Sequence, residues 1–122
     1  MSNPRHELGR RAEAAVATWL SSNGWRILDR RWRGPRGELD LVSLDPGGVL
    51  VGVEVKLRST GRAGSGADSV DRRRVARLRA TLADYAVGGN VAHVDTRLDL
   101  VTVAPADDGR WRMRRLPGID AW

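Results

Sequence analysis

Apolar residues recur at helical spacing in two stretches of the chain. The first stretch follows Asn3 and Pro4, a pair that can cap a helix and fill its first turn, and it ends at the turn sequence SSNG. The second is predicted from Arg72 to Val87, with Asp71 or Ser69 as its cap and two glycines after it. The apolar positions are Leu8, Ala12, Ala15, Val16, Trp19 and Leu20 in the first stretch, and Val75, Leu78, Leu82 and Ala86 in the second. Each stretch is therefore predicted to be an amphipathic helix that packs one face against a core.

Shorter segments have the composition and alternation of β-strands. They cover residues 25–33, 38–44, 49–58, 96–103 and 110–116. The second and third are joined by the hairpin sequence DPGG, and the arginines of the last suit an edge strand, because charge discourages pairing between molecules. The order of helix, three strands, helix and one or two strands predicts one α/β domain over residues 1–122, with a mixed central sheet flanked by helices.

The strand VGVEVKLR carries charge where a buried strand would not. Because side chains alternate along a strand, its valines share one face, and Glu54 and Lys56 share the other with Gly52. The simplest alternative is that Glu54 and Lys56 form an ordinary exposed ion pair, which adds little stability. Of the 21 Lys and Arg residues, however, Lys56 is the single lysine. A compact ammonium is therefore indicated at this position in preference to a planar guanidinium.

The neighbouring strand supplies a second carboxylate, Asp40. If Asp45 pairs with Val49 across a three-residue loop, Asp40 lies opposite Glu54 and the two acids converge. If Leu44 pairs with Val49 instead, Asp40 faces a valine and the acids separate, so the interpretation depends on the register.

Two adjacent carboxylates repel each other unless a proton or a cation lies between them. The chain has no cysteine and only two histidines, which makes a zinc site improbable, so a metal would be held by oxygen, as Mg²⁺ or Mn²⁺ is. Glu13, at the rim of the first helix's apolar face, is a possible third ligand. Glu38 is a weaker candidate, which precedes Asp40 by two and is expected to share its face. Lys56 would then orient an attacking water and neutralise charge on a phosphate.

The charge of the chain, +6 at pH 7, favours a polyanionic partner, although an arginine-rich composition alone would give the same value. Arg72, Arg73, Arg74 and Arg77 of the second helix are the predicted phosphate contacts. The segment from Ser59 to Asp68 is rich in glycine and serine and is expected to be a mobile loop that can close over a bound strand. No apolar run of membrane-spanning length or secretory signal is recognised, so a cytoplasmic protein without membrane contact is expected.

Several stretches, taken together and in order, resemble those of a known family. They are LGRRAEAAVATWLSSNGWRILDRRWR, GELDLVSLD, VGVEVKLRS, SVDRRRVARL and TRLDLVTV. The chain looks like a member of the YraN-like (UPF0102) family of small bacterial proteins, and its Asp followed by EVK resembles the core motif of the PD-(D/E)xK nuclease superfamily. The chain departs from these patterns at Arg73 or Arg74, where the family usually has lysine, and at Leu39, where the superfamily has proline.

That resemblance implies a restriction-endonuclease-like fold, with Asp40 and Glu54 as metal ligands, Lys56 as the catalytic lysine and Glu13 as the helix acid. The carbonyl of Val55 is a further candidate ligand. Three hypotheses follow for function: a nuclease that uses Mg²⁺ or Mn²⁺ on nucleic acid, with DNA favoured over RNA and branched DNA among the substrates; a nucleic-acid-binding domain of the same fold that cleaves nothing; and a protein-interaction domain. Either a monomer or a homodimer is compatible with the sequence.

Overall fold

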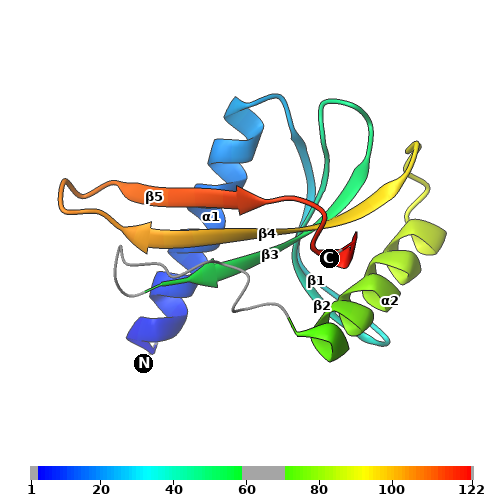
Figure 1. Ribbon diagram of the computed structural model, residues 1–122, viewed down its shortest axis with the longest axis horizontal. Coiled ribbons are helices and arrows are strands. Elements are labelled where there is room, and N and C mark those ends of the chain that lie inside the picture. Colours follow the sequence, from blue (N-terminus) through cyan, green and yellow to red (C-terminus); the bar gives the residue numbers. More distant parts are fainter. Residues whose placement is uncertain (1–2, 59–70, 122) are drawn as a thin grey trace.

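The computed structural model describes residues 3–58 and 71–121, and the predicted loop from Ser59 to Asp68 lies outside this part of the chain. The elements are α1 (Pro4–Ser22), β1 (Arg26–Gly34), β2 (Gly37–Leu44), β3 (Leu50–Leu57), α2 (Arg72–Gly88), β4 (Thr96–Pro105), β5 (Trp111–Leu116) and the short 3₁₀ helix η2 (Ile119–Ala121) (Figure 1). Each predicted helix and strand is confirmed, with ends that differ by one or two residues. No helix in the described ranges is both long and apolar enough to cross a membrane.

The five strands form one sheet in the order β1-β2-β3-β4-β5. The first three make an antiparallel meander, β4 lies parallel to β3, and β5 pairs antiparallel with β4 at the edge. A parallel neighbour requires a crossover between β3 and β4, and α2 lies within that connection. The predicted α/β fold with a mixed sheet is therefore confirmed, and the segment RWRMRRL is an edge strand, as expected.

The two helices pack on opposite faces of the sheet (Figure 1). The face under α1 buries Ala12, Val16, Ala17 and Leu20 of the helix against Leu41, Val51, Val53, Val101 and Val103 of the strands. The face under α2 buries Leu78, Leu82 and Tyr85 against Leu39, Val42, Leu50, Leu98 and Leu100, with Ile119 of η2. The valine face of β3 is therefore core, as predicted, and the face that carries Glu54 and Lys56 is shared with α2.

The predicted caps fix where both helices begin. The Asn3 Oδ1 atom accepts a hydrogen bond of 2.9 Å from the backbone N–H of Arg5. The Asp71 Oδ1 atom likewise accepts one of 2.9 Å from the backbone N–H of Arg73. Such caps stabilise a helix by about 1 kcal/mol. The cap at Asp71 therefore sets the position of the arginines in the first turn of α2.

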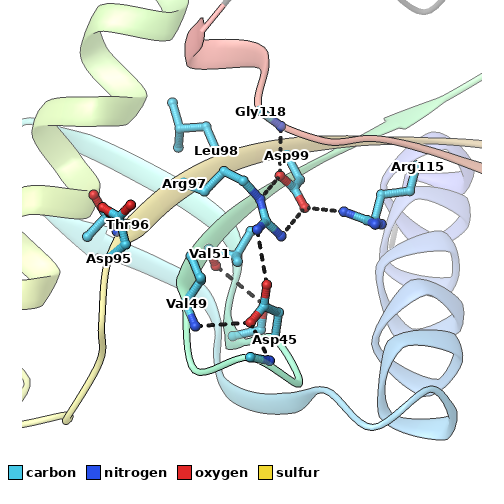
Figure 2. A network of polar contacts seen from close by, with 12 residues as sticks. Asp45, Val49, Val51, Asp95, Thr96, Arg97, Leu98, Asp99, Arg115 and Gly118 are labelled. Carbon is cyan, nitrogen blue, oxygen red and sulfur yellow. Dashed lines mark hydrogen bonds and ion pairs between the residues drawn. The ribbon is translucent and has the colours of Figure 1, made fainter.

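A buried charge network connects the C-terminal end of the chain to the sheet (Figure 2). Asp99 is 0% exposed, and its carboxylate accepts two hydrogen bonds from Arg97, at 2.8 and 3.1 Å, and one from Arg115 at 2.9 Å. The backbone N–H of Gly118 donates a fourth, at 3.0 Å, and Arg97 also donates to Asp45 at 3.0 Å. This network joins β4, β5 and the β2–β3 hairpin. It was not anticipated from the sequence.

Candidate functional site

The hairpin between β2 and β3 has the register that brings the two acids together. The backbone N–H of Asp45 donates to the carbonyl of Val49 at 3.0 Å, and the paired positions run from Leu44 with Leu50 to Leu41 with Val53. The Asp45 carboxylate also accepts hydrogen bonds from the N–H groups of Gly47, within the loop, and Val49, directly after it. The three-residue loop is therefore confirmed, and one step further along the same register Asp40 lies opposite Glu54.

The backbone of β2 changes its alternation at Asp40. Leu39 packs in the cluster under α2, whereas Leu41, two residues later, packs in the cluster under α1. Opposite this point on β1, Arg31 adopts a left-handed conformation with φ of 46°. Strict alternation would have placed Leu39 and Leu41 on one face. The expectation that Glu38 shares the face of Asp40 rested on strict alternation, and the break at Asp40 removes its basis.

Asp40 and Glu54 form a tightly coupled pair of acids. The Asp40 Oδ2 atom accepts a hydrogen bond of 2.8 Å from the backbone N–H of Val55, which ties the carboxyl to β3. The pKa of Asp40 is raised to about 7, first by burial and then by the charge of Glu54 and a hydrogen bond with it, while the Val55 N–H and Arg74 act in the opposite direction. Asp40 therefore keeps its proton up to about neutral pH, as expected for a buried acid beside a second carboxylate.

A third acid reaches this region from α1. Glu13 lies 3.9 Å from the Arg31 guanidinium, and its pKa is raised by burial and by the charge of Asp40. Glu38 instead pairs with the exposed Arg33, at 3.3 Å. Within the described ranges, no group of three His, Cys, Asp or Glu side chains is arranged to hold a metal ion. The structure thus brings Glu13 within electrostatic reach of Asp40 but does not place it beside Asp40 and Glu54 as a third ligand.

Lys56 lies beside Glu54 but does not pair with it. Glu54 accepts a hydrogen bond of 2.7 Å from the Arg74 guanidinium of α2, so the simple alternative of a Glu54–Lys56 ion pair is not what the structure shows. Glu54, Lys56, Arg74 and Leu100 line a small central hollow of about 120 Å³. Lys56 is exposed and makes no hydrogen bond or ion pair with the described residues. Its ammonium is therefore available to a ligand in the central hollow.

The predicted arginines of α2 divide into two groups. Arg72 and Arg73 are exposed in the first turn. Arg74 and Arg77 line a second depression of about 230 Å³, the arginine hollow, whose remaining lining includes Arg36, Glu38 and Thr81. Arg36 was not predicted as a site residue, because it lies in a turn where there is no periodicity to interpret. Its position between Pro35 and Gly37 was the only signal, and it indicates a turn. It donates two hydrogen bonds to Asp84, at 2.8 and 3.1 Å, which fix its orientation.

The donor atoms fit a hard divalent cation. Mg²⁺ is commonly bound by one or two carboxylates, with water and phosphate oxygens completing its octahedral shell. Asp40 and Glu54 provide two adjacent carboxylates, and neither a thiolate nor an imidazole lies among the residues that line the central hollow. The residues present therefore suit Mg²⁺ or Mn²⁺ better than zinc.

Comparison with protein families shows to which family this chain belongs. The family model described as "Uncharacterised protein family UPF0102" matches residues 12–103. The chain belongs to the UPF0102 family. The match includes the four site residues Glu13, Asp40, Glu54 and Lys56, and all of α2.

Individual relatives agree with the family model. The UPF0102 chain is 42% identical to a UPF0102 protein of Anaeromyxobacter dehalogenans over 113 residues, which cover 93% of this chain and 83% of the relative. A UPF0102 protein of Deinococcus radiodurans is 39% identical over 121 residues, covering 96% and 98% of the two chains. Among solved structures, Pyrococcus furiosus SfsA in complex with Ca²⁺ is similar with a TM-score of 0.35 and 14% identity, over 92% of this chain and 63% of SfsA.

The raised pKa of Asp40 predicts that the UPF0102 chain is stabilised by Asp40→Asn at alkaline pH. The folded state keeps the Asp40 proton up to about pH 7, whereas an unfolded chain loses it near the ordinary value of 3.8. The folded state therefore binds more protons between these values, and stability falls as the pH rises through this window. The ceiling of this effect is about 4 kcal/mol, and we expect a gain of about 2 kcal/mol for the variant at pH 8, since the carboxyl is not fully buried.

Urea denaturation in chelator at pH 5 and pH 8 measures this gain. The advantage of Asp40→Asn should be small at pH 5 and larger at pH 8. Asp84→Asn is a matched control, since Asp84 is paired with Arg36 and its pKa is lowered. If Asp40→Asn destabilised the chain equally at both pH values, Asp40 would be an ordinary structural acid.

Proposed function

We propose that this chain is a metal-dependent nuclease of the PD-(D/E)xK type that hydrolyses phosphodiesters in nucleic acid, with DNA favoured over RNA. The observation that supports it most is the close pair of Asp40 and Glu54, two acids from neighbouring strands. The pKa of Asp40 is raised, and the adjacent Lys56 makes no ion pair with the described residues. Buried acids with a strongly raised pKa cost stability, and they are concentrated at functional sites. A purely structural role would give no reason to keep two carboxylates together here.

Asp40 and Glu54 would hold Mg²⁺ or Mn²⁺, with Glu13 and the carbonyl of Val55 as further oxygen donors. A bound divalent cation supplies positive charge that stabilises the phosphoryl transition state. The N–H of Val55 already orients the Asp40 carboxyl, at 2.8 Å. Val55 directly follows Glu54 in the chain, so β3 positions both the Glu54 carboxylate and the Val55 carbonyl.

The cationic residues act on the substrate. Lys56 positions the attacking water, whose oxygen forms a new bond to phosphorus while one ester bond to phosphorus breaks. The attacking water gives up a proton to solvent, and the leaving oxygen takes up a proton from solvent. Lys56 stabilises the charge that develops on the phosphate. Arg72, Arg73, Arg74 and Arg77 hold neighbouring phosphates at the start of α2. The assignments of Lys56, Arg74 and Arg77 are supported by their places in the central and arginine hollows. Arg72 and Arg73 line neither hollow and are exposed in the first turn of α2.

One contact favours the alternative of a nucleic-acid-binding domain that cleaves nothing. The Arg74 guanidinium lies 2.7 Å from Glu54 and already neutralises part of the acidic pair. A site whose charge is balanced by its own arginine does not need a metal. The two functions differ in whether Arg74 leaves Glu54 when a divalent ion is added.

A cleavage assay on a panel of labelled substrates tests the proposal. Duplex, single-stranded, flapped and four-way DNA and matching RNA are incubated with Mg²⁺, with Mn²⁺ and with chelator. Metal-dependent cleavage of at least one substrate is expected. Equal binding in chelator and in metal, with no product from any substrate, would favour the binding domain. Affinity that hardly changes between 50 and 200 mM salt would instead favour a protein-interaction domain, because phosphate contacts make binding salt-dependent.

Arg74→Gln is expected to strengthen divalent-ion binding. The substitution removes the guanidinium that competes for Glu54 and repels an incoming cation, so we expect Mn²⁺ affinity to rise about three- to tenfold. Calorimetric titration without nucleic acid measures it. Arg112→Gln, on the exposed side of β5, makes the same change of charge away from the site and should leave Mn²⁺ affinity as it is. Weaker Mn²⁺ binding in Arg74→Gln would show that the arginine supports the metal site instead of competing with it.

A further inference from the structure

Three depressions adjoin one another across the site because they share cationic side chains. The arginine hollow and the central hollow share Arg74. The central hollow shares Lys56 with a third depression, the leucine hollow, which lies between the start of α1 and the ends of β3 and β4. The leucine hollow is lined by Arg5, Leu8, Lys56, Leu57, Arg58 and Pro105. We call the three adjoining hollows the track. Cations line each of the three hollows, and the central hollow, in the middle, contains the candidate catalytic site.

The three hollows differ in size. The central and arginine hollows have volumes of about 120 and 230 Å³. The leucine hollow has about 540 Å³. Sites that enclose organic ligands have about 300 to 1,000 Å³, so only the leucine hollow of these three falls in that range. The two smaller hollows suit a phosphate group, whereas the leucine hollow has room for a nucleoside.

The lining of the leucine hollow also differs in chemistry. Two leucines and a proline provide an apolar wall. Among the described residues that line it, the three charged ones are all cations, whereas the other two hollows each contain a glutamate. Leu8 is half-buried and belongs to neither core cluster of the described residues, so its place in the hollow is not explained by packing of the core. An apolar wall beside cations can contact a base and its phosphate at the same time.

We propose that the leucine hollow is a nucleoside subsite, which takes an unpaired nucleotide on one side of the phosphate that lies at Lys56. This inference rests on the proposed function and adds a substrate class to it. A base that lies against Leu8 and Pro105 is not available for pairing, so the strand must be single-stranded on that side. The arginine hollow, on the other side of Lys56, binds only a phosphate, so the base on that side can be paired or unpaired. Flaps, single strands and branch points meet this requirement, and continuous duplex does not.

Binding of two short strands with equal charge tests the subsite. Fluorescence anisotropy in chelator compares a labelled single-stranded oligonucleotide with a fully abasic strand of the same length, and both are measured against duplex. The abasic strand is expected to bind about fivefold or more weakly, since contacts to a base are lost while the phosphates remain. In Leu8→Ala this difference should shrink to about twofold or less. In Val87→Ala, a change at a position that is 87% exposed and remote from the track, it should persist.

The outcomes separate this inference from the nuclease proposal. Equal affinity for the two strands, or a base-dependent difference that Leu8→Ala leaves unchanged, overturns the nucleoside subsite even if the protein cleaves DNA. A base-dependent difference that requires Leu8 supports the subsite even if no substrate is cleaved. Circular dichroism of Leu8→Ala controls for folding. Arg36→Gln provides an internal comparison, because loss of a phosphate contact should weaken both strands by the same factor.

Discussion

Lys56→Ala is expected to lower the rate of phosphodiester cleavage by about 10²- to 10⁴-fold while nucleic-acid binding changes little. The reason is the position of the ammonium: it lines the central hollow with Glu54 and Arg74, and it has no partner among the described residues. One phosphate contact among several contributes little to affinity, but a group that positions the attacking water acts on the transition state. Single-turnover cleavage and anisotropy with the same substrate separate the two effects.

Lys56→Arg distinguishes a specific ammonium from a general positive charge. A guanidinium is larger and planar, and the central hollow has only about 120 Å³, so we expect Lys56→Arg to bind nucleic acid normally and to cleave as poorly as Lys56→Ala. Arg110→Ala, in an exposed turn where the side chain is 86% accessible, is the matched loss of charge and should retain the full rate. A cleavage rate within threefold of the parent in Lys56→Ala would remove Lys56 from the mechanism.

The fold could be predicted because local signals agreed with one another. The caps at Asn3 and Asp71, the hairpin loop and the alternation of β3 each act over a few residues, and the structure has all of them. The register of β2 and β3 was one of two alternatives in the sequence, and the loop hydrogen bonds of Asp45 decide it. From that register alone, Asp40 and Glu54 come to face each other.

The sequence could not give the detailed geometry of the site, because it depends on breaks in periodicity and on contacts between distant segments. The change of alternation at Asp40 has no local signature, and it accompanies the left-handed conformation of Arg31 on a different strand. The contact of Arg74 with Glu54 joins residues 20 positions apart, one on α2 and one on β3. The charge pattern in the sequence predicted that Arg74 binds phosphate. In the structure its guanidinium donates a hydrogen bond to Glu54, and this contact must break before Glu54 can bind a metal ion.

The buried network around Asp99 illustrates the same limit, and it predicts the largest loss of stability. Asp99→Ala is expected to destabilise the fold by about 3–5 kcal/mol, because it leaves Arg97 and Arg115 without the carboxylate that joins them. Both guanidinium groups also lie over the ring of Trp25, at 5.9 and 5.2 Å from its centroid, so they cannot turn to solvent without losing that contact as well. Since small domains have a total stability of about 5–15 kcal/mol, this single change should remove a large share of it.

Urea denaturation of Asp99→Ala beside Asp108→Ala measures the effect against a matched control. Asp108 also pairs with an arginine, Arg110, but the two side chains are 62% and 86% exposed and their charged atoms are 3.9 Å apart, so its loss should cost less than about 1 kcal/mol. Asp99→Asn, which keeps the shape and part of the hydrogen bonding, should fall between the two. Equal stabilities of Asp99→Ala and Asp108→Ala would mean that the arginines find water or other partners, and that backbone pairing and apolar packing hold the hairpin, β4 and β5 together without this network.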